Sequence, residues 1–71
     1  MTSWEKEKAL RLRWKRSMKY IAEVTGISLD HLKYAEQRCT PMTLHDAVQL
    51  SKYFGKPIEY FLDDYFDSDY S

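Results

Sequence analysis

Hydrophobic side chains recur every three or four residues along most of the chain, which is the spacing of an amphipathic α-helix. The pattern predicts five helices, over residues 4–14, 18–25, 29–37 and 44–54 and in a last segment that begins at Pro57. The side chains expected on their buried faces are Ala9, Leu10, Trp14, Ile21, Ala22, Thr25, Leu32, Ala35, Leu44, Ala47, Val48, Leu50, Ser51, Phe54, Ile58, Phe61 and Leu62. No segment alternates with the two-residue period of a β-strand, so the predicted fold class is all-α.

Polar residues and glycines mark the ends of these helices. Ser17, Ser28 and Thr43 each precede a helical segment, where a hydroxyl oxygen can accept a hydrogen bond from a free backbone N–H group. Gly26 and Gly55 follow the second and fourth segments and permit the left-handed backbone with which many helices end. The predicted helices are therefore joined by short turns.

The chain has 71 residues, which is enough for one domain of modest stability. We expect this domain to span residues 1–62 and an acidic, aromatic tail to follow at residues 63–71. No apolar run approaches the ~20 residues of a membrane-spanning helix, and the charged N-terminal stretch does not have the apolar core of a signal peptide. The single cysteine, Cys39, excludes an intrachain disulfide and suits a reducing compartment. These features favour a cytoplasmic protein.

Eleven basic and eleven acidic side chains give a formal net charge of zero, which taken alone argues against a nucleic-acid partner. The charges are unevenly distributed, however, with a net +5 over residues 1–19, −1 over residues 20–43 and −4 over residues 44–71. A basic half of this kind can approach phosphate groups while the acidic half faces away, or it can bind an acidic partner. Two solvated faces of a small domain explain the same distribution.

The segment from Ile21 to Leu32 has the pattern of two helices that cross steeply through a short turn. The small Ala22 allows the two backbones to approach, and Gly26 permits the turn. Ile27 and Leu32 are expected to fill the space between the helices.

Together with its neighbours, this segment resembles the lambda-repressor/Cro-type helix-turn-helix family of DNA-binding domains, which includes the xenobiotic-response-element-like domains. The resemblance extends from about Leu10 to Leu62. The matching residues are Ile21, Ala22, Gly26, Ile27, Ser28, Leu32, Glu36, Thr43, Leu44, Ala47, Val48, Leu50, Ser51, Phe54, Gly55, Ile58 and Phe61. It implies a five-helix domain in which Arg11 of the first helix forms a structural ion pair with Glu36 of the third.

Some positions depart from the family pattern. Arg38 stands in place of a glycine, and Cys39 and Thr40 replace basic residues of the following loop. Arg16 occupies a position that is usually apolar, and we expect Trp14 to fill that space.

In this family the third helix lies in the DNA major groove and its N-terminal residues contact base edges. The resemblance implies base contacts by Ser28, Leu29, Asp30, Lys33 and Tyr34. It implies phosphate contacts by Ser17, Met18, Lys19, Gln37 and Arg38, with further charge from Arg13, Lys15 and Arg16. A solvated basic surface accounts for each basic residue taken singly, and Leu29 and Tyr34 are equally compatible with a protein contact.

The expected function is sequence-specific regulation of transcription by a Cro-type repressor of a phage or mobile element, which acts by covering a promoter. We expect it to bind double-stranded DNA in the bacterial cytoplasm, near the nucleoid, as a homodimer formed through the aromatic C-terminal segment with Tyr65 and Phe66. The alternative is a protein-interaction module on the same fold, such as an anti-repressor or an inhibitor of a host protein. Asp30, Leu29 and the acidic tail favour that alternative.

Neither catalysis nor metal binding is predicted, and no cofactor is expected. His31, Cys39 and His45 match no common zinc-site spacing, and surface or capping roles explain both histidines more simply. Asp30 and His31 are adjacent in sequence, and no serine or cysteine nucleophile is placed beside them.

Overall fold

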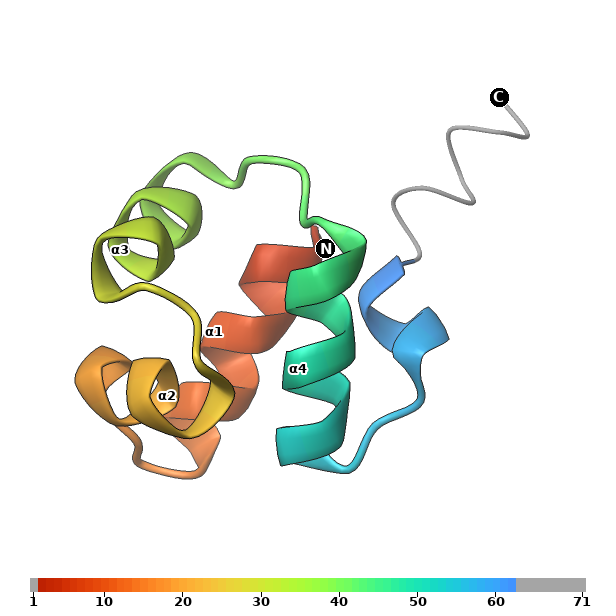
Figure 1. Ribbon diagram of the computed structural model, residues 1–71, viewed down its shortest axis with the longest axis horizontal. Helices are drawn as coiled ribbons and strands as arrows, with labels where there is room; N and C mark the ends of the chain where they lie inside the picture. The colour runs from red at the N-terminus through yellow and green to blue at the C-terminus, as the bar shows by residue number, and fades with distance from the viewer. Residues whose placement is uncertain (1, 63–71) are drawn as a thin grey trace.

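The computed structural model describes residues 2–62 and shows only helices and connecting turns in that range. The helices are α1 (Ser3–Arg13), α2 (Met18–Thr25), α3 (Leu29–Arg38) and α4 (Leu44–Phe54), followed by a helical segment at residues 58–62 (Figure 1). The five predicted helices are confirmed to within one residue at the ends that the structure describes. Over residues 2–62, none of the helices is both long and apolar enough to cross a membrane. The tail at residues 63–71, with the expected dimer contacts Tyr65 and Phe66, lies outside the described residues.

The capping residues set the helix ends. Ser17, Ser28 and Thr43 each accept a hydrogen bond from the backbone N–H three residues later, at 3.1, 3.3 and 3.2 Å respectively. Gly26 and Gly55 end α2 and α4 with φ angles of 76° and 68°, in the left-handed region that favours glycine. The turns predicted from these five residues are therefore confirmed.

The cap of α1 was not predicted from the sequence. Thr2 and Glu5 form a capping box, in which the Thr2 N–H donates to the Glu5 carboxylate at 2.8 Å and the Glu5 N–H donates to the Thr2 hydroxyl at 3.2 Å. The backbone bond from Thr2 and its hydroxyl lower the pKa of Glu5, because both favour the ionised carboxylate. This box begins α1 one residue before the predicted start.

One hydrophobic core lies between the helices, and every element contributes to it. Its buried side chains are Trp4, Leu10, Ile21, Ile27, Leu32, Ala35, Met42, Ala47, Leu50, Phe54 and Phe61. Three residues predicted to be buried are instead exposed: Ala9, Trp14 and Leu44. Trp14 follows the last residue of α1 and Leu44 is the first residue of α4, so both stand at a helix end, outside the buried stripe. Trp4 and Met42 are buried in the core instead.

The helical segment at residues 58–62 packs against the beginning of α1. The Ser3 hydroxyl donates a hydrogen bond to the carbonyl of Phe61, and the Lys6 ammonium donates to the carbonyl of Tyr60 at 3.0 Å. Because the Phe61 side chain is fully buried, this segment belongs to the core and is not an appendage.

Candidate nucleic-acid interface

A three-residue turn joins α2 to α3, and its conformation is fixed from within. The Thr25 hydroxyl donates to the carbonyl of Ile21 at 2.6 Å and accepts from the backbone N–H of Ile27 at 3.3 Å. The side chains of Ile27 and Leu32 are buried, as the sequence predicts. The turn therefore holds α3 at one angle to α2.

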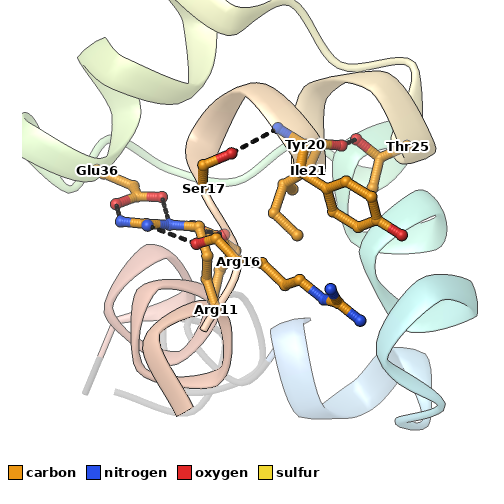
Figure 2. A network of polar contacts seen from close by, with 8 residues as sticks. Arg11, Arg16, Ser17, Tyr20, Ile21, Thr25 and Glu36 are labelled. Carbon is orange, nitrogen blue, oxygen red and sulfur yellow. Dashed lines mark hydrogen bonds and ion pairs between the residues drawn. The ribbon is translucent and has the colours of Figure 1, made fainter. Parts of the chain in front are cut away.

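Arg11 connects both helices to α1 (Figure 2). Its Nε and Nη2 atoms donate to the two carboxylate oxygens of Glu36 in α3, at 3.0 and 2.8 Å. Its Nη1 atom donates to the carbonyl of Arg16 at 3.0 Å, directly before the residue that caps α2. The pair expected between Arg11 and Glu36 is thus present in the structure, and one guanidinium group fixes the start of α2 relative to α3.

A second carboxyl group, that of Glu7, is buried beside this pair and was missed from the sequence. The Glu7 side chain is fully enclosed, and none of the described residues donates a hydrogen bond to its oxygens. The Arg11 Nε atom is 3.9 Å from it and is already bonded to Glu36. Burial, with the neighbouring Glu36 carboxylate, raises the pKa of Glu7 to about 9, so Glu7 is protonated at neutral pH.

The same packing shifts the pKa values of Glu36 and Arg11. Burial acts to raise the pKa of Glu36, but the hydrogen bonds from Arg11, together with the adjacent Glu7 carboxyl group and the charge of Arg11, outweigh it, so the pKa of Glu36 is lowered. The bond to Glu36 raises the pKa of Arg11. One ion pair and one neutral acid are therefore enclosed between α1 and α3. Glu7 precedes Arg11 by one helical turn, and this spacing is the sequence signal that they share a face.

The candidate base contacts lie along the outer face of α3. Ser28, Asp30, Lys33 and Tyr34 are exposed, and Leu29 is half-buried. The oxygen of Ser28 is already engaged as the helix cap, and Asp30 lies in the first turn, where the helix dipole stabilises an acidic group.

The candidate phosphate contacts fall into two separate groups. Ser17 and Lys19 are exposed and Met18 is half-buried, at the N-terminal end of α2. Gln37 and Arg38 are exposed in the last turn of α3, about 13 Å from its start by helical rise. The guanidinium of Arg38 lies over the ring of Tyr34, 5.2 Å from the ring centroid.

The histidines have structural or surface positions. The His31 Nε2 atom is 2.8 Å from a carboxylate oxygen of Asp46, which joins α3 to the first turn of α4. The His31 ring also packs against Trp4 in a T-shaped arrangement, at 5.7 Å between centroids. His45 is exposed and Cys39 is the exposed C-cap of α3. Within residues 2–62, no group of three His, Cys, Asp or Glu side chains is placed to hold a metal ion.

Comparisons of the chain with protein-family models, with curated proteins and with solved structures gave no match.

Proposed function

We propose that this protein is a sequence-specific DNA-binding regulator of transcription with a lambda-repressor-like helix-turn-helix fold. In this proposal the N-terminal half of α3 enters the major groove and the start of α2 lies against the phosphate backbone. The observation that carries the proposal is the set of three hydrogen bonds from Arg11, to Glu36 and to the carbonyl of Arg16. These bonds support it because they fix the start of α2 relative to the C-terminal part of α3, while outer side chains of both helices stay exposed.

The start of α2 is better suited to phosphate than the start of α3. The first turn of α2 contains no acidic residue, whereas that of α3 contains Asp30. The free N–H groups and the dipole of α2 attract an anion, and the exposed Lys19 adds a positive charge. We therefore assign α2 to backbone contacts and α3 to base contacts.

The residues of α3 offer a mixed set of base contacts. Lys33 can donate to the acceptor atoms of guanine, and Asp30 can accept from the amino group of cytosine. Leu29 can pack against a thymine methyl group. The proposed protein acts by occupying a promoter as a homodimer in the bacterial cytoplasm, as a Cro-type repressor of a phage or mobile element does.

We expect selection from random double-stranded DNA to enrich one sequence, and the double substitution Lys19→Ala plus Lys33→Ala to weaken binding to it at least tenfold. Loss of the phosphate contact at Lys19 lowers the dependence of log K on log salt by about one. Loss of Lys33 relaxes the preference at one base pair by about 1–3 kcal/mol. Fluorescence anisotropy at several salt concentrations measures both effects.

The matched control removes two lysines elsewhere, through Lys52→Ala plus Lys56→Ala. It changes the net charge equally but alters the end of α4 and the turn after it. Enrichment of no sequence, or an equal loss of affinity in both double variants, contradicts the proposed function.

Asp30→Asn is expected to raise the affinity for random DNA severalfold. The exposed carboxylate lies on the face assigned to DNA and repels phosphate, and the amide removes this charge while keeping the size of the side chain. If Asp30 contacts cytosine, the same substitution lowers the ratio of specific to random binding. If the substitution changes binding neither to the selected sequence nor to random DNA, then α3 does not approach DNA through its first turn.

A protein-interaction module is the second candidate function. Its support is the exposed Tyr34 ring, whose accessible fraction is 53%, beside the half-buried Leu29 and the acidic Asp30. A defined partner whose binding is abolished by Tyr34→Ser, together with no sequence preference for DNA, favours this candidate over the first.

A further inference from the structure

Three aromatic rings form a surface patch where α1, α2 and α4 meet. We define the aromatic patch as Trp14, Tyr20 and Tyr53. The ring centroid of Tyr53 is 5.6 Å from that of Trp14 and 6.2 Å from that of Tyr20. Trp14 and Tyr20 are 41% and 38% exposed, although their rings already pack against neighbours. Folding therefore leaves part of this aromatic surface in contact with water.

The chain around the aromatic patch is rich in positive charge. The guanidinium of Arg16 lies over the Tyr20 ring, 4.9 Å from its centroid (Figure 2). The two stretches that contain the rings, residues 8–22 and 47–58, have no acidic residue, and the acidic residue that follows them on α2 is Glu23. The exposed basic side chains adjacent to the three rings in sequence are Arg13, Lys15, Lys19 and Lys52. This composition favours an anionic partner.

The backbone at Lys15 supports a function for its side chain. Its φ angle is 56°, in the left-handed region that favours glycine. The turn is held there by backbone bonds from the Lys15 N–H to the carbonyl of Leu12 at 3.0 Å and from the Arg16 N–H to the carbonyl of Arg11 at 2.9 Å. A lysine at this strained position, directly after Trp14 and exposed, suggests that the charge itself is used.

We propose that the aromatic patch binds single-stranded nucleic acid, with a base stacked on Trp14 and phosphate groups held by Lys15 and Arg16. Exposed aromatic rings among cations are the arrangement on which unpaired bases stack while the backbone is neutralised. The bases of a duplex are stacked on each other, so they cannot cover Trp14 in this way. A guanidinium that lies over an aromatic ring can still bind phosphate through its edge.

The size of the aromatic patch fits a short stretch of such a strand. The two ring separations place Trp14 within about 12 Å of Tyr20. A stacked strand rises about 3.4 Å per nucleotide, so the patch covers roughly three to four nucleotides. The proposal goes beyond the proposed function, because it concerns an unpaired strand and uses none of the base contacts assigned to α3.

Tryptophan fluorescence tests the proposal directly. Trp4 is 1% exposed and Trp14 is 41% exposed, so acrylamide quenching reports mainly on Trp14. We expect an octamer of deoxythymidine to bind the full chain and to shield Trp14 from acrylamide. An abasic octamer with the same phosphates should bind about tenfold more weakly, because it has no base to stack. Equal binding of the two octamers overturns the proposal.

Two substitutions in the aromatic patch and its turn separate binding from folding. Trp14→Leu keeps an apolar contact with Phe54 but cannot stack on a base, and it should weaken octamer binding about tenfold in fluorescence anisotropy. Lys15→Gly should weaken it severalfold without lowering the urea midpoint, because glycine adopts this φ angle without strain. Unchanged affinity in both variants overturns the proposal.

Tyr34→Leu is the matched control. It removes an exposed ring that also has an arginine over it, since the Arg38 guanidinium is 5.2 Å from the ring centroid, but this ring lies on α3. It should leave octamer binding unchanged, and a loss equal to that of Trp14→Leu overturns the proposal. If residues 63–71 or a second copy cover the aromatic patch instead, the octamer fails to shield Trp14, which also overturns it. The proposed function is measured on duplex DNA, so either can fail while the other holds.

Discussion

Arg11→Met is expected to remove most of the stability of the protein at neutral pH and room temperature. The substitution removes two hydrogen bonds to Glu36 and one to the carbonyl of Arg16, while methionine retains much of the apolar stem. Removing one partner of a buried ion pair costs about 3–5 kcal/mol, because the other charge stays enclosed. The whole stability of a domain of this size is of the order of 5 kcal/mol. Far-UV circular dichroism during urea titration measures the loss.

Two variants separate the unpaired charge from the lost packing. Arg11→Met combined with Glu36→Leu leaves no unpaired carboxylate, so it should regain most of the stability that the single substitution loses. Arg11→Lys keeps the positive charge but cannot form the bidentate hydrogen bonds to Glu36. Its stability should therefore lie between those of the wild type and Arg11→Met. A single variant within about 1 kcal/mol of the wild type shows that the pair contributes little to stability.

The helices were predictable because their signals are local. Ser17, Ser28 and Thr43 cap helices through bonds that span three residues, and hydrophobic periodicity needs only a few turns of sequence. The predicted buried faces were wrong at two helix ends, at Trp14 and Leu44, and at Ala9 within α1. Trp14 was assigned to the buried stripe by its spacing, but it is the C-cap of α1 and is 41% exposed, with its ring packed against the edge of the core at Phe54. A capping pair such as Thr2 and Glu5, ahead of the apolar pattern, is also easily missed.

The polar contacts that position α2 and α3 were only partly predictable. The pair of Arg11 with Glu36 was implied by the resemblance and is present, but the bond from Arg11 to the carbonyl of Arg16 depends on a main-chain atom that any residue supplies. His31 and Asp46 are 15 residues apart, at positions that the sequence pattern leaves polar. The contacts with DNA stay predictions.

Glu7→Gln is expected to stabilise the protein at neutral pH, by up to about 3 kcal/mol. Folding raises the pKa of Glu7 from 4.5 to about 9, because the carboxyl group is buried beside the Glu36 carboxylate. Above pH 4.5 the unfolded chain loses this proton while the folded chain keeps it, so stability falls as the pH rises towards the raised pKa of Glu7. Glutamine is neutral at every pH and can still donate a hydrogen bond to Glu36, so it removes this cost.

The pH dependence of this gain separates it from an ordinary packing effect. Below pH 4.5 Glu7 is protonated in both states, so Glu7→Gln should change stability little, and its advantage should grow from pH 5 to pH 8. Glu36 acts in the opposite sense: folding lowers its pKa, so its contribution to stability is present above pH 4.5 and is lost as the solution is acidified.

Glu5→Gln is the matched control, because the exposed Glu5 has a lowered pKa and loss of its carboxylate cannot stabilise the protein at neutral pH. Urea titrations at pH 4, 6 and 8 compare the three proteins. If Glu7→Gln is destabilising at pH 8, then Glu7 is ionised in the folded protein and is held by Arg11 across the 3.9 Å separation.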